Sequence, residues 1–242
     1  MSEFGVYVHI PFCRHRCDYC AFATWTDRDH LMVDYVDAVI ADIARAVEKG
    51  MPVADTVFFG GGTPTRLAPE LLASIVSAIP VTSNAEITVE CNPDDVTVEM
   101  MKIYAAAGVN RISMGVQSMN PDILAFSNRN HEAQQSVLAF DAARKVGFQN
   151  ISVDLMFGFP GQTLEQWKAD VMFWKGKNPE HISLYSLTVE DRTALKKWVK
   201  SKQVFLLEEE KVAEMFHWTS EFLEEHGWEH YEVSNFARGG FR

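Results

Sequence analysis

The chain has 242 residues, of which 47% are hydrophobic and 23% charged, a balance typical of a soluble globular protein with one sizeable core. Its net charge of −11 gives no basic stripe of the kind that nucleic-acid binding needs. No signal-peptide pattern and no run of about 18 apolar residues is present. Three of the four cysteines lie in one loop, which argues against a disulfide scaffold, so we expect a cytoplasmic protein without a transmembrane segment.

Short apolar runs alternate with longer amphipathic runs, which is typical of repeated βα units around a parallel sheet. We predict six strands, at Val6–Ile10, Thr56–Phe59, Ile87–Glu90, Arg111–Gly115, Ile151–Asp154 and Ile182–Tyr185. The helices are predicted from apolar residues at helical spacing. Prolines and a capping box mark helix starts, and glycines mark helix ends. The predicted helices are Leu31–Lys49, a helix from Pro69, Thr97–Ala107, Pro121–Phe126, His131–Val146, a helix after Thr163 and Leu206–His226.

Six consecutive βα units predict an α/β fold, an incomplete (β/α)6 barrel that is open at one side. We expect residues 1–189 to form this core. Residues 190–242 should form a helical extension and the start of a truncated C-terminal region. The lysines of Glu190–Phe205 are most simply explained as a solvated face. An apolar interior left open would favour association or instability.

Cys13, Cys17 and Cys20 follow the first predicted strand with C-x3-C-x2-C spacing. A structural zinc site needs four ligands, usually in two separated pairs, whereas three thiolates in one loop suit a [4Fe–4S] cube with one iron open to a small molecule. A partial zinc site and cysteines without a metal are the two alternatives. The intervening Arg14, His15 and Arg16 could offset negative charge at such a cluster. Cys91 is interpreted as a core thiol, with an extra ligand as the minority interpretation.

Polar or glycine residues follow the other predicted strands, where βα barrels place their ligand contacts. The turn Gly60-Gly61-Gly62-Thr63-Pro64-Thr65 could approach a ligand closely and direct free N–H groups at an anion, although it could equally be a plain βα loop. Glu90 ends the third strand, where a ribose, an ammonium or a structural salt bridge would satisfy its charge. Gln117 follows the fourth strand and Asp154 ends the fifth.

The segment YVHIPFCRHRCDYCAF, residues 7–22, resembles the start of the radical S-adenosylmethionine (SAM) proteins, in particular the oxygen-independent coproporphyrinogen III oxidase-like family. The resemblance extends to Arg238 and includes GGGTPT, residues 60–65, letter for letter. It implies that the three cysteines hold a [4Fe–4S] cube, that SAM caps the open iron and that reductive cleavage of SAM gives a 5′-deoxyadenosyl radical. It also implies the SAM-binding residues, which are Tyr7, Tyr19, Gly61, Gly62, Thr63, Glu90, Gln117, Arg129 and Asp154. Asn128 stands where the family normally has glycine, which leaves Arg129 the least secure of these.

Within this family the oxidases resemble one another in carrying a further cysteine two positions after the third, where this chain has Phe22. This departure favours the haem chaperone branch, in which the protein would bind haem and transfer it to an acceptor protein. The alternative is the oxidase itself, which decarboxylates porphyrinogen propionates in porphyrin biosynthesis, so whether the chain is an enzyme stays open. A reducing partner is expected beside the acceptor. A third class, a cluster-carrying electron-transfer module, is disfavoured by the glycine turn and the strand-end carboxylates, because electron transfer needs no substrate pocket. No histidine stands out as a haem ligand: His9 is interpreted as a core residue or a support for the cluster loop.

Overall fold

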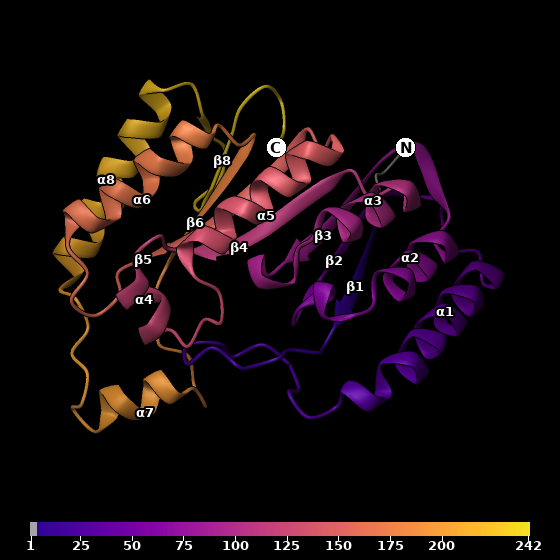
Figure 1. Ribbon diagram of the computed structural model, residues 1–242, viewed down its shortest axis with the longest axis horizontal. Helices are drawn as coiled ribbons and strands as arrows, with labels where there is room; N and C mark the ends of the chain where they lie inside the picture. Colours follow the sequence, from indigo (N-terminus) through magenta and orange to yellow (C-terminus); the bar gives the residue numbers. More distant parts are fainter. Residues whose placement is uncertain (1–3) are drawn as a thin grey trace. The chain divides into compact units, whose positions relative to one another are not determined.

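The computed structural model describes residues 4–242, which form α-helices and a mostly parallel β-sheet (Figure 1). The chain divides into two compact units. The first comprises the chain up to Arg16, Phe22–Ser113 and Leu138–Gln149, and the second comprises Cys17–Ala21, Met114–Val137 and Asn150–Arg242. The cysteine loop, strand β4 and helix α5 each contribute residues to both units.

All six predicted strands and all seven predicted helices are present, so the α/β prediction is confirmed. The strands are β1 Gly5–Ile10, β2 Ala54–Gly61, β3 Val81–Cys91, β4 Arg111–Gln117, β5 Asn150–Phe157, β6 His181–Ser186, β7 Glu229–His230 and β8 Asn235–Ala237. The helices are α1 Met32–Glu48, α2 Pro69–Ala78, α3 Val98–Ala107, α4 Pro121–Phe126, α5 Ala133–Val146, α6 Leu164–Lys177, α7 Ala194–Lys200 and α8 Glu209–Glu225. The sequence did not predict α7, β7 and β8, which have two to seven residues each and are too short to show a clear hydrophobic period.

In the first unit β1, β2 and β3 pair in parallel in that order, and β4 begins beside β3. Val57 of β2 pairs with Val6 of β1 on one side and with Ile87 of β3 on the other. Helix α2 packs against both α1 and α3 (Figure 1). Fully buried side chains such as Leu72 and Met101 fill the space beneath these helices, as expected when βα units cover a parallel sheet.

In the second unit the order continues from the end of β4 through β5, β6 and β8 to β7. Strands β5 and β6 are parallel, with Val153 beside Ile182, but β8 is antiparallel to both β6 and β7. Strands β7 and β8 lie outside the six predicted βα units, and a connection of only four residues between them permits a hairpin and no parallel crossover. Across the described residues, hydrogen bonds do not close the strand order into a barrel.

Helix α6 begins with the capping box that the sequence predicted. Thr163 Oγ1 accepts a hydrogen bond from the Gln166 N–H at 3.2 Å, and the Thr163 N–H donates to Gln166 Oε1 at 2.9 Å. Farther along, the buried Trp167 Nε1 donates to Thr219 Oγ1 of α8 at 2.6 Å. Helices α6 and α8 therefore pack together with this buried indole N–H and hydroxyl paired.

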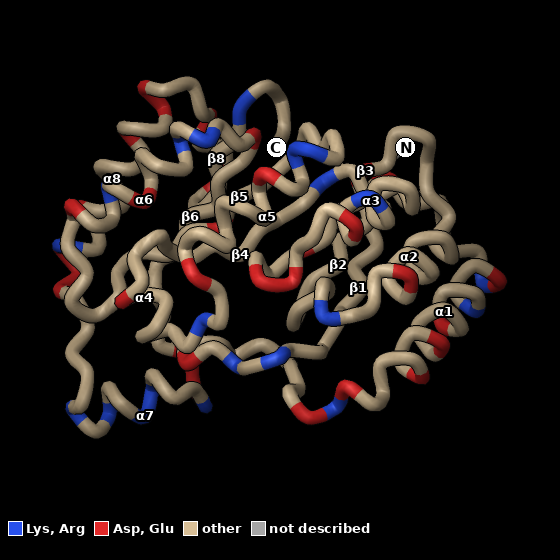
Figure 2. The backbone as a smooth tube through the Cα atoms, in the orientation of Figure 1, with Lys and Arg blue, Asp and Glu red and all other residues tan. Residues whose placement is uncertain are grey.

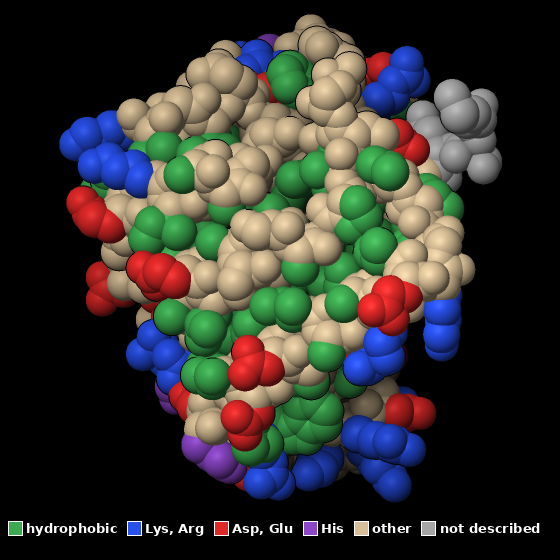
Figure 3. Space-filling view, turned by 90° about the vertical axis from the view of Figure 1, so that its right-hand side faces the viewer, with side chains coloured by type: hydrophobic (Ala, Val, Ile, Leu, Met, Phe, Trp, Pro, Cys, Tyr) green, Lys and Arg blue, Asp and Glu red, His purple; other side chains and the backbone are tan. Residues whose placement is uncertain are grey.

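Charged residues of both signs are distributed along the helices and loops (Figure 2). On α7, Lys196, Lys197 and Lys200 are exposed, which confirms the solvated face expected there. In the first unit, Val33 and Val47 of α1 are exposed, and Figure 3 shows hydrophobic side chains on this side in separate groups with charged residues between them. In the part of the chain that the structure describes, no helix is long and apolar enough to cross a membrane.

We predict that Thr163→Ala lowers the free energy of unfolding by about 1 kcal/mol, because it leaves the first turn of α6 without its side-chain acceptor. Urea denaturation measures this change. Thr26→Ala, at an exposed threonine outside any helix, is the control and should change stability by less than about 0.5 kcal/mol. Equal effects of the two substitutions would contradict a role for the cap.

Candidate cofactor site

Cys13, in the first unit, lies directly after β1 and is 9% exposed. Its N–H donates to the Trp25 carbonyl at 3.0 Å, which fixes the start of the cysteine loop. Thr63 Oγ1 donates to Cys13 Sγ at 3.5 Å, and Asn92 Nδ2 donates to Thr63 Oγ1 at 3.2 Å. A hydroxyl donor at the sulfur favours the thiolate form, and Asn92 orients that hydroxyl.

The glycine turn after β2 brings this strand against the start of the cysteine loop. Gly61 has a φ of 107°, which favours glycine, and a Cβ on Gly62 would lie 2.8 Å from the Ile10 carbonyl oxygen. The N–H groups of Gly62 and Thr63 donate to the carbonyls of Ile10 and Phe12 at 2.8 and 2.9 Å. The prediction that the turn directs free N–H groups at an anion is therefore wrong for these two groups, because the backbone before Cys13 accepts them.

Tyr7 and Glu90 lie on neighbouring parts of the same unit. Tyr7 is 57% exposed, and its pKa is raised by partial burial and by the charge of Glu90. The Tyr7 hydroxyl is 3.0 Å from His9 Nδ1, while His9 Nε2 donates to the Ala23 carbonyl at 2.8 Å. His9 thus supports the segment that follows the cysteine loop, in line with one of the two interpretations made from the sequence.

Arg14 and Arg16 of the cysteine loop bind protein oxygens. Arg14 Nη2 donates to Asp95 Oδ1 at 3.1 Å, and Arg16 Nη2 donates to the Thr24 carbonyl at 2.6 Å. Burial and the neighbouring Asp94 raise the pKa of Asp95, while the bonds from Arg14 and a threonine hydroxyl oppose this shift. Arg14 therefore forms an ion pair with Asp95. The sequence had suggested that Arg14 offsets the negative charge of a cluster, and it did not predict this ion pair.

In the second unit Cys17, Tyr19 and Cys20 lie close to Arg129. Arg129 Nη1 donates to Cys17 Sγ at 3.5 Å, and Nη2 donates to the Gly115 carbonyl at 2.6 Å. The Cys20 N–H donates to the Cys17 carbonyl at 3.0 Å. Burial raises the pKa of Tyr19, the Arg129 charge lowers it, and the adjacent cysteines raise it further. Arg129 thus places a positively charged hydrogen-bond donor beside the Cys17 sulfur.

The residue before Arg129 explains the departure from the family pattern. Asn128 has a φ of 56°, the left-handed region, which asparagine enters more readily than other residues with a side chain. Asparagine can therefore replace the usual glycine here without moving the backbone that carries Arg129.

Gln117, the last residue of β4, occupies a strained turn. Its φ is 68°, and the Ser118 N–H donates to the Val116 carbonyl across it at 2.9 Å, which makes a γ-turn of the rare kind with positive φ. The Gln117 side chain is buried, and its Oε1 has no hydrogen-bond partner among the described residues. A buried acceptor without a donor is costly in a folded protein, which makes this oxygen a candidate acceptor for a donor of a bound ligand.

The structure places Asp154 within β5, three residues before the strand ends at Phe157, so the predicted strand end was wrong. The strand continues because Leu155, Met156 and Phe157 are buried like the residues before them. Asp154 Oδ1 accepts a hydrogen bond from Ser152 Oγ at 3.4 Å. Asp154 therefore lies three residues before the strand end, where a ligand contact was expected.

A row of hydrogen-bonded polar side chains that begins at Ser152 was not predicted from the sequence. Ser152 Oγ lies 2.8 Å from His181 Nδ1, and His181 Nε2 lies 2.8 Å from the Tyr231 hydroxyl. Ser152 of β5 is the register partner of His181 of β6. Polar residues at matching positions of two neighbouring strands could have predicted this contact.

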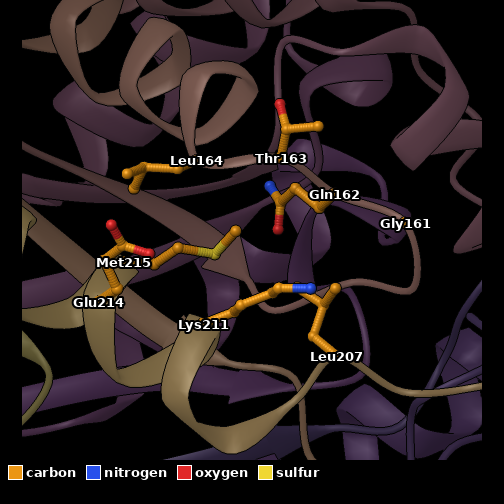
Figure 4. A pocket seen from close by; sticks show the side chains of 8 residues that line it. All are labelled: Gly161, Gln162, Thr163, Leu164, Leu207, Lys211, Glu214 and Met215. Carbon is orange, nitrogen blue, oxygen red and sulfur yellow. The ribbon is translucent and has the colours of Figure 1, made fainter.

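Among residues 4–242, no three His, Cys, Asp or Glu side chains form a ready site for one metal ion. A cavity of about 370 Å³ lies between the start of α6 and α8 in the second unit, lined by Gln162, Thr163, Lys211 and Met215 among others (Figure 4). None of the residues that line it was predicted from the sequence to bind a cofactor.

Comparison with known proteins shows the family to which the chain belongs. Residues 7–173 match the Radical SAM superfamily, and the chain belongs to that superfamily. Its relatives include the haem chaperone HemW of Bacillus subtilis, 39% identical over 98% of this chain and 64% of that protein. The mitochondrial radical S-adenosyl methionine domain-containing protein 1 of Danio rerio is 36% identical over 98% of this chain and 54% of that protein.

Among solved structures, coproporphyrinogen III oxidase (HemN) of Escherichia coli has a TM-score of 0.87 and 26% identity. The match covers 98% of this chain and 56% of that one. The similarity to HemW and to HemN bears out the branch and the fold inferred from the motifs. The chain spans between 54% and 64% of the length of these three relatives.

Membership of the superfamily implies a [4Fe–4S] cluster and SAM, and the residues present fit both. All four cysteines of the described chain are thiols, and donors reach the sulfurs of Cys13 and Cys17. Gln117 offers a buried acceptor to a ligand. Cys91 lies buried at the end of β3, where the sequence predicted a core thiol.

We predict that Asn128→Ala lowers the free energy of unfolding by about 1 kcal/mol, because alanine is strained at positive φ. Asn128→Gly should leave stability unchanged or raise it slightly. Thermal denaturation of the two variants checks this pair, and equal stabilities would contradict the explanation given for the asparagine.

A second prediction concerns Asp170 of α6, which is 2% exposed and whose pKa burial raises to about 6, against the effect of hydrogen bonds from Ser118 and Met119. Between about pH 4 and 6 the folded chain keeps a proton that the unfolded chain has released. The free energy of unfolding should therefore fall as pH rises through this range, by about 3 kcal/mol from this group. Urea denaturation of the wild type and of Asp170→Asn checks the slope, and identical slopes would contradict it.

Proposed function

We propose that this chain carries the cofactor-binding part of a radical SAM haem chaperone. The observation that carries the proposal is the 39% identity to a haem chaperone across 98% of the chain. Phe22, in place of a cysteine two positions after Cys20, supports this branch over the oxidase. The proposal includes a core of residues 1–189 and an extension of residues 190–242, in a cytoplasmic protein.

The proposed cluster ligands are Cys13, Cys17 and Cys20. The support is their spacing, the family and the two hydrogen bonds that reach their sulfurs. Thr63 would hold the Cys13 thiolate in place, and Arg129 would stabilise the Cys17 thiolate by its charge. When bound, the cluster and SAM supply one-electron redox chemistry that no protein side chain provides here.

The proposed SAM-binding residues come from the strands β1 to β5 and from the segments that follow them. Most of them offer a polar atom, an aromatic ring or a glycine at or after a strand end, as ligand contacts in such folds require, whereas Tyr7 and Asp154 lie within β1 and β5. They are Tyr7, Tyr19, Gly61, Gly62, Thr63, Glu90, Gln117, Arg129 and Asp154. Glu90 and Asp154 would accept from hydroxyl or ammonium groups, and Gln117 Oε1 is the acceptor that a ligand donor would satisfy.

The second candidate function is that of an oxygen-independent coproporphyrinogen III oxidase, for which the TM-score of 0.87 to HemN is the specific observation. In that case the chain would bind a porphyrinogen and remove carboxyl groups. Under the leading proposal it binds haem instead and passes it to an acceptor protein, and a reducing partner supplies the electron.

Replacement of Cys13, Cys17 or Cys20 by alanine should abolish cluster assembly, whereas Cys91→Ala should retain it, because only the first three share the loop. Anaerobic reconstitution with iron and sulfide, followed by iron analysis and electron paramagnetic resonance with and without SAM, provides the measurement. An unchanged signal on adding SAM, or cluster loss in Cys91→Ala only, would contradict the assignment.

Haem titration of the full-length protein separates the two functions. If the protein is a haem chaperone, it should take up haem stoichiometrically and then transfer it to a haem-depleted protein. It should not decarboxylate coproporphyrinogen. Decarboxylation with formation of 5′-deoxyadenosine, and no haem uptake, would favour the oxidase.

A further inference from the structure

The γ-turn at Gln117 is held from two sides by the buried side chains of His131 and Asp170. On the strand side, His131 Nε2 donates to the Val116 carbonyl at 3.0 Å. On the other side, Asp170 accepts from the Ser118 hydroxyl at 2.5 Å and from the Met119 N–H at 3.0 Å. His131 and Asp170 are 3% and 2% exposed, so solvent does not weaken these bonds.

The hydrogen bonds from Asp170 extend beyond one residue. Ser118 Oγ, which donates to Asp170, also accepts from the Asn120 N–H at 3.0 Å, and the Asn120 side chain caps α4. One carboxylate on α6 therefore fixes the three residues that follow Gln117. A positive φ at a residue with a long side chain is strained and persists only where its surroundings determine it.

We propose that Asp170 is a positioning residue that, by binding Ser118 and Met119, holds Gln117 in its strained turn and so presents the buried Gln117 Oε1 to a hydrogen-bond donor of SAM. The inference rests on the proposed SAM site. Asp170 does not touch the ligand: its effect on SAM passes through Gln117 alone. Without the carboxylate, the turn can relax to a negative φ, which redirects the Gln117 side chain.

The first test is a double-mutant cycle on the 242-residue chain with its cluster reconstituted, with SAM affinity measured by equilibrium dialysis. Asp170→Ala should weaken SAM binding about tenfold, in keeping with the strain that the turn stores. Asp170→Asn should bind SAM nearly as the wild type does, because its amide can accept from Met119 and donate to Ser118 Oγ. In a Gln117→Ala background, Asp170→Ala should weaken binding by less than about twofold.

Thr219→Val is the matched control, because it removes another buried hydrogen bond of α6, donated by Trp167, that does not involve Ser118 or Met119. It should lower thermal stability without changing SAM affinity. Equal losses of affinity from Asp170→Ala with and without Gln117, or a loss of affinity in Thr219→Val, would overturn the proposal in favour of general destabilisation.

A second readout needs neither cluster nor SAM. Hydrogen exchange at the Ser118 amide, which closes the turn onto Val116, should accelerate at least about tenfold in Asp170→Ala and stay near the wild-type rate in Asp170→Asn. Unchanged exchange would overturn the proposal even if the wild-type chain binds SAM. Failure of the wild-type chain to bind SAM, with accelerated exchange in Asp170→Ala, would instead refute the proposed SAM site and leave the hold on the turn intact.

Discussion

The contact on which the first unit depends is the close approach of the end of β2 to the backbone before Cys13. Two N–H groups of the glycine turn donate to carbonyls on either side of Pro11, and any side chain at Gly62 would collide with that backbone. The approach brings Thr63 to the Cys13 sulfur. A loop rich in cysteine has little regular structure of its own, so its first cysteine is positioned by the neighbouring strand.

A different solution operates in the second unit, where backbone strain and buried hydrogen bonds place the functional groups. Gln117 and Asn128 both have positive φ, and Arg129 reaches from the second of these turns to Cys17 and Gly115. Strain of this kind concentrates at functional sites, because a folded core must hold it in place. The two units thus present site residues by rigid backbone contact and by supported strain respectively.

The sequence predicted most of the architecture, because hydrophobic spacing and helix caps are local signals. The capping box at Thr163 and Gln166 is an example, since both hydrogen bonds are present. Strand ends were less predictable: β5 continues past Asp154 because burial, and not polarity, decides where it stops. The hairpin of β7 and β8 escaped prediction because strands of two and three residues show no period.

The residues that support the site could not be predicted from the sequence. Asp170 is far from Ser118 in the chain, and only the packing of α6 brings the two together. The same holds for Asn92, which orients the hydroxyl beside Cys13. A sequence motif records groups that touch a cofactor, whereas their supports are chosen by three-dimensional proximity and can differ between relatives.

The hydrogen bond between His181 and Tyr231 joins residues 50 positions apart. It therefore affects where the chain can be shortened. His181 is 2% exposed at the start of β6, so without the Tyr231 hydroxyl its imidazole would lose a buried partner. A shorter version should therefore keep the segment through β8, even though that segment lies outside the six βα repeats. The smallest portion of this protein suited to crystallisation or spectroscopy is set by a tyrosine in a hairpin and not by the last parallel strand.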